Sequence, residues 1–358
     1  MLHFYKLTVS DIRKETADCV SVAFQIPDKI KEDFSFIQGQ NITIKKIIND
    51  HEIRRSYSIC TSPSQNELRV AIKKVEDGLF SSYANEQLKI GDELDVLQAV
   101  GTFHTTLNKN YQKKYLAFAA GSGITPIISI IKTTLETEPN SEFTLVYGNK
   151  SRASIIFFEE LENLKNKYIT RFNLIHILSR EKTDSLINFG RIDKEKLSDL
   201  NKLIHYSLLD EAFICGPEEM IFCIKDYLEE IGIEKKKIHF ELFTSSNKLK
   251  KKIIKQEPTK NNETLSNISL KIDGRTLDIK ISLNSDTTIL DAALQQGADL
   301  PYACKGGMCC TCKAKLIEGE VSMDVHWGLE HEEIEKGFIL TCQSHPKTEK
   351  VVIDFDIK

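Results

Sequence analysis

The segment from Pro301 to Cys312 contains four of the nine cysteines in this chain. It includes Cys304, Cys309 and Cys312, and a further cysteine, Cys342, follows later. Four residues separate the first two cysteines, two separate the next two, and twenty-nine precede the last. This spacing is typical of a plant-type [2Fe–2S] ferredoxin, in which four thiolates hold the two irons. We therefore predict that these four cysteines are the ligands of a [2Fe–2S] cluster.

Other uses of these cysteines fit the sequence less well. A structural zinc site usually contains two closely spaced cysteine pairs, whereas Cys342 stands alone. A disulfide framework requires an oxidising compartment, which nothing in the sequence indicates. Cys310 would break the ligand spacing if it replaced Cys309, so we interpret it as a small buried residue. Gly306 and Gly307 permit the positive φ and the close backbone approach that a loop around a cluster requires.

Length, charge and cysteine content restrict the class of protein. At 358 residues the chain is expected to form two or three domains. A net charge of −4 gives no indication of nucleic-acid binding, and no nucleic-acid partner is expected. The longest apolar stretch, residues 115–131, is interrupted by Gly121, Gly123 and Pro126, which argues against a membrane partner or span. The first residues lack the pattern of a secretory signal, so the nine cysteines predict a reducing, cytoplasmic location.

Charge is distributed unevenly along the chain. Residues 266–358 contain 10 Lys and Arg against 15 Asp and Glu, whereas residues 245–263 contain 6 against 2. The sequence therefore predicts an acidic C-terminal domain on a basic tether.

The first 110 residues predict an antiparallel β-barrel or sandwich. Short β-rich runs alternate with turns, and this spacing is typical of barrels and sandwiches. One helix is expected to start near Ser81 or Ser82 as its N-cap and to end at Leu88. The predicted strands cover residues 4–9, 19–26, 41–48, 53–60, 68–74 and 93–98.

The rest of the chain predicts a parallel sheet, a linker and a third domain. Residues 111–243 alternate between strands and helices, which favours a doubly wound α/β sheet. Residues 244–265 are polar and rich in lysine, so we predict a linker. In residues 266–358, Asp273-Gly274-Arg275 indicates a hairpin. The strands expected in the α/β domain are 115–120, 143–147, 172–178, 212–215 and 238–242, and the expected helices are 125–136, 155–166, 218–231 and, before the cysteine loop, 289–296.

Two short motifs in the first domain together indicate a flavin. Arg55 offers a forked cation for a pyrophosphate. Tyr57 could cover a flat aromatic ring, and Ser58 could form a hydrogen bond with a ring nitrogen. The segment Gly78-Leu79-Phe80-Ser81-Ser82 leads into the predicted helix, whose free N–H groups suit a phosphate. Either motif alone could also be an exposed strand or an ordinary helix cap.

Two turns in the second domain suggest a nicotinamide nucleotide. In Gly121-Ser122-Gly123-Ile124-Thr125-Pro126 the glycines let the backbone approach a pyrophosphate, and the proline suits a first helical turn. Cys215-Gly216-Pro217 also joins a strand to a helix. Because nucleotides lie at the carboxyl edge of such sheets, Cys215 could face the nicotinamide. Ser179-Arg180 could hold a ribose 2′-phosphate and Ser151-Arg152 is a second candidate, although either arginine could equally be a solvated surface residue.

These motifs, in this order, resemble the ferredoxin–NADP⁺ reductase superfamily. With a plant-type ferredoxin segment at the carboxyl end, the whole chain resembles oxygenase reductases, above all the reductase components of phenylacetyl-CoA epoxidases. Residues 190–193, 210–217, 323–326 and 340–343 add to the match. The resemblance implies an FAD-binding β-barrel domain over 1–110, an NAD(P)-binding α/β domain over 111–243, a linker over 244–265 and an α+β, β-grasp ferredoxin domain over 266–358.

The resemblance also implies roles for individual residues. Ser58, Cys215 and Glu241 are expected at the reaction centre, where Ser58 and Cys215 position reactants and do not act as nucleophiles. The residues expected to bind FAD or NADPH are Arg55, Ser56, Tyr57, Ser58, Ile72, Lys73, Gly78, Phe80, Ser81, Ser82, Gly121, Gly123, Thr125, Pro126, Arg152, Ser179, Arg180, Cys215, Gly216 and Pro217.

The predicted function is an NAD(P)H-dependent oxidoreductase. Hydride is expected to pass from NADPH to FAD, and single electrons then pass to the [2Fe–2S] cluster and on to an oxygenase. The resemblance implies that this oxygenase is a di-iron phenylacetyl-CoA epoxidase of phenylacetate catabolism. Two alternatives are a reductase for another oxygenase or electron acceptor, and a non-enzymatic iron–sulfur electron-transfer or sensor protein. The intact flavin and nucleotide motifs argue against the second.

Overall fold

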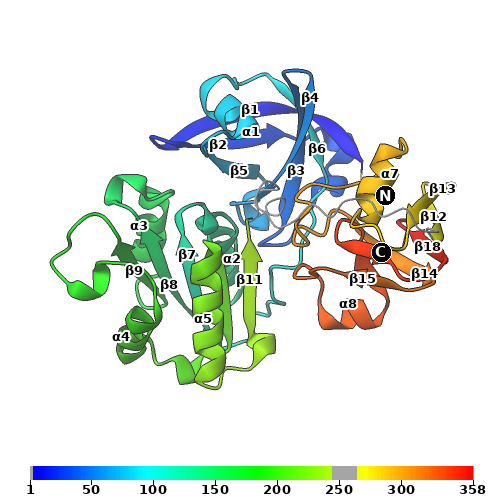
Figure 1. Cartoon of the computed structure of the whole chain (residues 1–358). Coiled ribbons are helices and arrows are strands. Elements are labelled where there is room, and N and C mark those ends of the chain that lie inside the picture. Colours follow the sequence, from blue (N-terminus) through cyan, green and yellow to red (C-terminus); the bar gives the residue numbers. More distant parts are fainter. Residues whose placement is uncertain (1–2, 244–263, 358) are drawn as a thin grey trace.

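The first domain is a six-stranded antiparallel barrel with the strand order β4-β3-β6-β1-β2-β5. The computed structural model describes residues 3–243 and 264–357, and Figure 1 places this barrel above the other two domains. A bridge between Ile59 and Val70 joins the two edge strands and closes the barrel. Its strands are β1 (Phe4–Thr16), β2 (Cys19–Gln25), β3 (Asn41–Ile48), β4 (His51–Ser58), β5 (Leu68–Lys73) and β6 (Glu93–Leu97).

The helix of the barrel domain starts earlier than predicted. Helix α1 spans Leu79–Glu86, with Gly78 as its N-cap, so Ser81 and Ser82 are not the cap residues. The amide of Ser82 donates to the Gly78 carbonyl, which makes the turn from Gly78 onward helical. The Ser81 hydroxyl donates to the same carbonyl at 3.1 Å and accepts from the Val75 amide at 3.2 Å, so it is engaged within the first turn.

A two-residue turn connects β3 to β4. Asn49 and Asp50 adopt positive φ angles of 51° and 61°, and Ile48 pairs directly with His51. Two consecutive residues with positive φ give a turn whose twist matches that of the flanking strands. The turn therefore fixes which residues of β4 lie on each face of the strand.

The second domain is a five-stranded, entirely parallel sheet with the order β11-β10-β7-β8-β9. Alternate residues of β7 enter two different cores: Tyr115, Ala117 and Ala119 lie in one, and Leu116 and Phe118 in the other. Helices therefore cover both faces, as the doubly wound prediction requires. The elements are β7 (Lys114–Ala120), α2 (Ile124–Thr137), β8 (Glu142–Asn149), α3 (Phe158–Lys167), β9 (Phe172–Leu178), α4 (Lys194–Ile204), β10 (Glu211–Gly216), α5 (Glu218–Glu230) and β11 (Ile238–Leu242).

Two helices of this domain differ from the prediction. Helix α3 begins at Phe158 and not at Ile155, because Phe157 has a left-handed φ of 61° that a helix cannot continue through. Helix α4 was not predicted. Its start is marked by Asp193, whose carboxylate accepts a hydrogen bond from the Lys196 amide at 2.9 Å.

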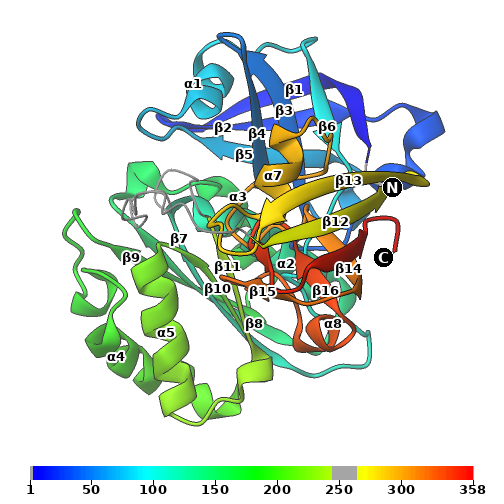
Figure 2. The same ribbon diagram turned by 45° about the vertical axis from the view of Figure 1, so that its right-hand side comes forward.

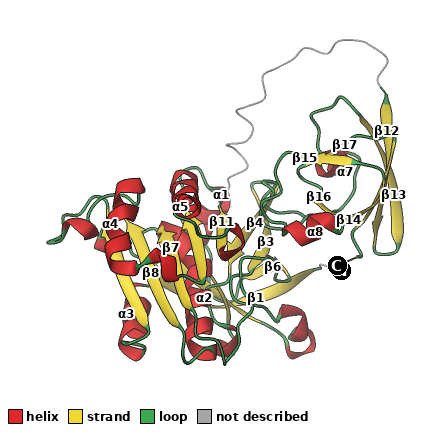
Figure 3. Ribbon diagram, turned by 90° about the horizontal axis from the view of Figure 1, so that it is seen from below, coloured by secondary structure: helices red, strands yellow, loops and turns green. Residues whose placement is uncertain are grey.

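The third domain has a mixed five-stranded sheet with the order β13-β12-β18-β14-β16, packed against α7. The predicted hairpin is present, because Asp273 and Gly274 form a two-residue turn of positive φ between β12 and β13. Figure 3 shows this hairpin at the outer edge of the molecule. The elements are β12 (Leu265–Ile272), β13 (Arg275–Ser282), α7 (Ile289–Gln295), β14 (Lys313–Glu318), β15 (Val321–Met323), α8 (His331–Glu335), β16 (Phe338–Leu340), β17 (Ser344–Pro346) and β18 (Lys350–Asp354).

The barrel, the doubly wound sheet and the β-grasp domain confirm the predicted fold class. Most of the predicted linker, residues 244–263, lies outside the described residues, and the exact domain boundaries stay a prediction. No helix in the described ranges is long and apolar enough to cross a membrane.

The third domain packs against both of the others (Figure 2). Met308 belongs to one core of the parallel-sheet domain, and Trp327 lies 6.1 Å from Phe222 of α5, measured between ring centroids. On the barrel side, the Thr102 hydroxyl donates to the Gly328 carbonyl at 3.2 Å. These contacts bring the cysteine loop to the place where all three domains meet.

Candidate functional site

The four predicted cluster ligands lie together in the third domain as two pairs. The amides of Cys304 and Cys309 each approach the other's Sγ at 3.5 Å, and the thiol of Cys342 is close enough to raise the pKa of Cys312. All except the half-buried Cys304 are buried. The interaction between these two thiols lowers the pKa of Cys309 and raises that of Cys304, so the pair favours one shared thiolate.

The backbone of the loop is shaped to surround sulfur atoms. The amide of Gly306 donates to Cys304 Sγ at 3.2 Å, and the amide of Cys309 approaches the same sulfur at 3.5 Å. Lys305 and Gly307 adopt positive φ angles of 50° and 73°, which turn the chain back on itself. Such N–H donors tune the potential of a bound cluster. Of the two glycines predicted to allow a positive φ, Gly307 adopts one and Gly306 does not. Lys305 and Cys310, which has a φ of 58°, adopt positive angles that the sequence did not indicate.

Cys310 faces away from the paired thiols. Its Sγ donates to the Gly328 carbonyl oxygen at 2.7 Å and is buried. Within residues 3–243 and 264–357, no three His, Cys, Asp or Glu side chains surround a single ion position. A [2Fe–2S] cluster needs two thiolates at each of two irons, so the two-plus-two arrangement fits that cofactor better than a mononuclear metal.

Successive residues of β4 serve opposite faces of the strand, as strand geometry requires. On one face, Arg55 is exposed and Tyr57 is half-buried, with the Tyr57 ring 5.7 Å from the Phe80 ring. Burial raises the pKa of Tyr57, so its hydroxyl stays neutral. These two residues form a cation and a flat aromatic surface of the kind expected for a flavin. The other face carries Arg54, Ser56 and Ser58 and points toward the neighbouring domains.

The three residues predicted at the reaction centre meet at the junction between the barrel and the parallel sheet. The Ser58 hydroxyl donates to Glu241 Oε2 at 3.2 Å, and Glu241 pairs with Cys215 across β11 and β10. Glu241 is 6% exposed, and burial raises the pKa of its carboxyl to about 8. Burial also raises the pKa of Cys215, so this thiol is not a nucleophile. A neutral hydroxyl, carboxyl and thiol can donate hydrogen bonds there without adding charge.

The remaining flavin candidates are more scattered. The Ile72 side chain is in the barrel core, Ser81 is engaged inside α1, and Ser82 is half-buried at the same helix end. Lys73 extends from β5 toward the glycine turn of the second domain, where its Nζ would be 3.9 Å from a Cβ added to Gly121. Of these residues, Lys73 and Ser82 are therefore the better placed to contact a cofactor.

Two turns form the predicted nucleotide edge of the parallel sheet. The first is a 3₁₀ turn, Gly121–Gly123, which continues directly into α2. The second is Cys215-Gly216-Pro217, which joins β10 to α5. Gly121 has a φ of +53°. A Cβ on Gly123 would overlap the Cys215 carbonyl, which belongs to the second turn. The Thr125 hydroxyl donates to the Ser122 carbonyl at 3.1 Å, which stabilises the first turn. The two turns thus pack together, with Pro126 and Pro217 at the starts of α2 and α5.

The candidates for a ribose phosphate lie farther along the same edge. The amides of Ser179 and Arg180 donate to the carbonyls of Asn149 and Lys150, which joins the ends of β8 and β9. Both arginines are exposed, but the Arg152 guanidinium stacks 4.6 Å from the centroid of Phe158. Arg180 is therefore the better candidate for contact with a bound phosphate.

Asn149 is a polar residue at this edge that the sequence reasoning missed. It is the last residue of β8, and its side chain is buried. Its amide nitrogen approaches the Tyr147 hydroxyl, but it makes no hydrogen bond of normal geometry to any described residue. An unpaired buried amide is costly unless a ligand or water pairs with it. Its position at the end of a buried strand, shortly before Ser151 and Arg152, was the available signal.

The cluster loop reaches the flavin side of the site. The Thr311 hydroxyl, between two ligands, lies 3.5 Å from that of Thr43 on β3, which in turn lies 3.3 Å from the Ser56 hydroxyl on β4. Both threonines are buried. The charge of Cys309 also contributes to the raised pKa of Glu241. The structure therefore brings the predicted flavin, nucleotide and cluster residues to one junction.

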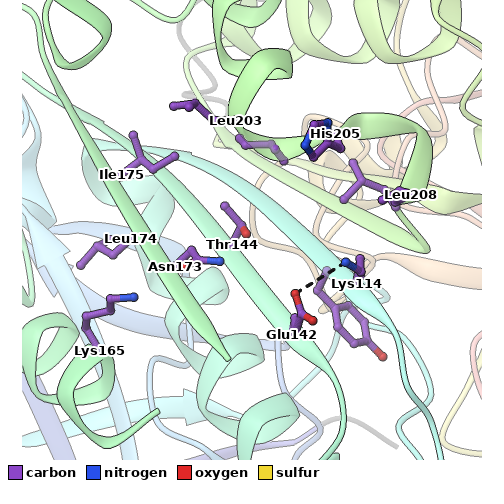
Figure 4. A pocket seen from close by; sticks show the side chains of 13 residues that line it. Lys114, Glu142, Thr144, Lys165, Asn173, Leu174, Ile175, Leu203, His205 and Leu208 are labelled. Atoms are coloured by element: carbon purple, nitrogen blue, oxygen red, sulfur yellow. Dashed lines mark ion pairs between the residues drawn. The ribbon is translucent and has the colours of Figure 1, made fainter. Parts of the chain in front are cut away.

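A pocket of about 380 Å³ lies elsewhere, at the amino ends of β7, β8 and β9 (Figure 4). Lys114 and Glu142 form an ion pair of 3.8 Å at its wall, and Leu203, His205 and Leu208 border it from the end of α4 and the segment that follows. None of the predicted site residues lines it. Since nucleotides bind at the carboxyl ends of parallel strands, this pocket is separate from the predicted site.

Comparison with known families supports the three-domain arrangement. Residues 6–105 match the oxidoreductase FAD-binding domain, residues 118–226 the oxidoreductase NAD-binding domain, and residues 270–347 the 2Fe-2S iron-sulfur cluster binding domain. Each match falls within one of the three folded domains described above. The residues at the junction thus belong to domains that bind FAD, a nicotinamide nucleotide and a [2Fe–2S] cluster.

Two curated relatives match along nearly their whole length. The chain is 45% identical to one of the subunits of the 1,2-phenylacetyl-CoA epoxidase of Escherichia coli, covering 100% of this chain and 99% of the relative. It is 33% identical to the ferredoxin reductase component of 3-ketosteroid-9-alpha-monooxygenase from Rhodococcus rhodochrous, covering 98% and 96%. Among solved structures, phthalate dioxygenase reductase superposes with a TM-score of 0.57 at 22% identity, covering 98% of each chain, and thus has the same fold.

Proposed function

The chain belongs to the family of oxygenase reductases that join FAD-binding, NAD-binding and [2Fe–2S] domains, and we propose that it supplies electrons to a phenylacetyl-CoA epoxidase. Membership confirms the predicted family, fold class, FAD and [2Fe–2S] cofactors and oxidoreductase class, in place of a non-enzymatic iron–sulfur protein. An oxygenase as the partner follows from the family. The 45% identity over the full chain is the observation that supports the particular oxygenase.

The residues at the junction suit the proposed electron path. When bound, a nicotinamide nucleotide, FAD and a [2Fe–2S] cluster supply two-electron and one-electron chemistry in that order. Ser58 and Glu241 would orient the flavin ring through neutral hydrogen-bond donors, and Cys215 would limit how the nicotinamide packs against it. Arg55 and Tyr57 would hold the flavin pyrophosphate and ring. The buried contact between Thr43 and Thr311 joins the flavin side directly to the cluster loop.

The deciding experiment couples the purified protein to purified oxygenases. NADPH oxidation and product formation are measured with a phenylacetyl-CoA oxygenase and, in parallel, with a ketosteroid oxygenase. We expect close to one product per NADPH with the first, and NADPH oxidation with little product from the second. Efficient product formation only with the ketosteroid oxygenase, or with neither, would contradict the proposed partner. Rates that fall with added salt would indicate electrostatic docking, which salt screens.

We further propose that NADPH is preferred over NADH because Arg180 binds the 2′-phosphate. A charge-assisted hydrogen bond contributes roughly 1.5–3 kcal/mol, which corresponds to a preference of about tenfold to a hundredfold. Arg180→Ala should lower kcat/KM for NADPH by this factor and leave that for NADH nearly unchanged. The measurement is the ratio of the two kcat/KM values with ferricyanide as the acceptor.

Two variants serve as controls for this prediction. Arg152→Ala tests the second candidate, whose guanidinium stacks on Phe158, and should have the smaller effect. Arg13→Ala removes an exposed arginine of the barrel and should leave the ratio unchanged. An unaltered NADPH to NADH ratio in Arg180→Ala would show that Arg180 is not the phosphate ligand.

A further inference from the structure

Arg54 is a buried cation at the boundary between the barrel and the ferredoxin domain. Its side chain is only 6% exposed, although it lies beside the exposed Arg55 in the same strand. Within the barrel, its Nε donates to Glu52 Oε1 at 2.8 Å. Across the boundary, Nη1 donates to the Leu300 carbonyl at 3.1 Å and Nη2 to Asp299 Oδ1 at 3.3 Å. One guanidinium therefore uses its fork of donors to join two domains.

Aromatic rings from both domains lie over the same guanidinium. Its central carbon is 4.3 Å from the ring centroid of Tyr302 in the ferredoxin domain and 5.2 Å from that of Phe4 in β1. Contacts of a cation with a ring face strengthen when water is excluded. The Arg54 site is thus complete only while the ferredoxin domain is docked on the barrel.

The partners of Arg54 lead directly into the cluster loop. Tyr302 is two residues before Cys304, the first predicted ligand, and Leu300 is buried. A shift of the segment from Asp299 to Tyr302 would move this ligand relative to the flavin side of the junction. Electron transfer depends on the distance between the flavin and the cluster. Because Arg54 holds the segment that leads into the first cluster ligand, its contacts fix the position of the cluster loop relative to the flavin side.

Arg69 shows what a purely structural arginine looks like in the same barrel. It is also buried, and it bonds to Glu67, Asp11 and Ser21. Every one of those partners belongs to the barrel, whereas Arg54 has Glu52 and Phe4 in the barrel and three contacts in the ferredoxin domain. Arg69 therefore stabilises the barrel, and Arg54 stabilises the docking of one domain on another.

We propose that Arg54 is a positioning residue that holds the ferredoxin domain in the arrangement in which its cluster receives electrons from the flavin. The inference rests on the electron path given under the proposed function, but not on the identity of the oxygenase. It assigns to Arg54 no contact with FAD, because the guanidinium is already occupied by Glu52 and by the segment from Asp299 to Tyr302. Loss of Arg54 should therefore slow cluster reduction and leave flavin reduction intact.

The test follows flavin and cluster reduction separately in the full-length holoprotein. NADPH is mixed with the protein in anaerobic stopped flow, and the two cofactors are monitored at their own wavelengths. Arg54→Leu, which removes the charge and keeps an apolar side chain, should slow the cluster phase at least about tenfold. Arg54→Lys, which restores the charge without the fork, should give an intermediate rate. In steady state, cytochrome c reduction should fall while ferricyanide reduction stays near wild type.

A surface variant on the opposite side of the boundary keeps the test decisive if Arg54→Leu folds poorly. Asp299 has a 92% exposed side chain, so Asp299→Arg should fold and place a repelling charge near Arg54. We expect a slower cluster phase at low salt and recovery at high salt, because salt screens exposed charges. Glu332→Arg makes the same charge change in α8, which Figures 1 and 2 show on the side of the domain away from the barrel, and should have no effect.

Two results would overturn the proposal. One is a wild-type cluster phase in Arg54→Leu that retains its FAD and iron. The other is a cluster phase that Asp299→Arg and Glu332→Arg slow equally, because the effect would then reflect net charge and not this contact. The rate of flavin reduction is measured in every variant. If it stays normal while one of these two results is found, this proposal fails and the proposed flavin chemistry stands. If flavin reduction itself is lost, the proposed flavin chemistry fails.

Discussion

Replacing Cys342 by Ser should abolish the [2Fe–2S] cluster while leaving flavin reduction by NADPH intact. Cys342 supplies one of the two thiols in its pair, and a serine hydroxyl is a harder and weaker ligand for iron at neutral pH. Iron content should fall from about two atoms per chain to a small fraction of that value. Cytochrome c reduction should fall to background, whereas ferricyanide reduction should stay near the wild-type rate. Iron analysis, the visible spectrum and the two acceptor assays measure these outcomes.

Cys310→Ser is the matched control for this prediction. The same substitution is made at a cysteine of the same domain, but the Cys310 thiol bonds to the Gly328 carbonyl and not to another thiol. A serine hydroxyl can replace that hydrogen bond, so the iron content should be retained. Loss of iron in Cys310→Ser and its retention in Cys342→Ser would exchange the ligand assignments. Loss of flavin reduction in Cys342→Ser would show that the domains do not function independently.

Gly123→Ala should disable the nucleotide site by separating two turns that are in contact. The added Cβ would overlap the Cys215 carbonyl oxygen and lie 2.5 Å from its carbonyl carbon and 2.9 Å from the Gly216 nitrogen. These atoms belong to β10 in the interior of a parallel sheet, so they cannot move aside as a flexible side chain would. Overpacking of this kind costs roughly 1–3 kcal/mol. We expect kcat/KM for NADPH to fall at least about tenfold with ferricyanide.

Gly121→Ala separates steric overlap from backbone strain. Gly121 has a φ of +53°, but a Cβ there would meet only Lys73 Nζ, at 3.9 Å. An alanine at positive φ costs about 1–2 kcal/mol but displaces no neighbouring backbone here, so this variant should be the milder one. FAD and iron content should be unchanged in both variants. Wild-type NADPH kinetics in Gly123→Ala would show that the contact between the two turns is not needed for nucleotide use.

The sequence predicted the parts of the site whose signal is local. The spacing of Cys304, Cys309 and Cys312 and the glycine turn at Gly121 lie within a few neighbouring residues, and the structure places each where a cofactor could bind. The alternation of strands and helices likewise predicted the parallel sheet, because each element carries its own apolar periodicity. Glu241 was expected only from a family resemblance, since a single glutamate in a strand carries no local signal.

The features that were missed depend on contacts between distant segments. Arg54 becomes important only because Asp299 and Leu300 fold against it, about 245 residues later in the chain. Asn149 is notable for an amide left unpaired by its surroundings, which no sequence pattern records. Ser81 was interpreted as a helix cap because serine favours that position, but its hydroxyl bonds within the first turn of a helix that Gly78 caps.

The two-residue turn between β3 and β4 limits how the length of this segment can change. Arg55 and Tyr57 on one face of β4, and Arg54, Ser56 and Ser58 on the other, keep these positions only while Ile48 pairs with His51. Because side chains alternate along a strand, deletion or insertion of one residue in the turn would exchange the two faces. The flavin residues and the domain-docking residues would then be lost in one step. Substitutions at Asn49 and Asp50 that tolerate positive φ would preserve both, so this hairpin can vary in sequence far more readily than in length.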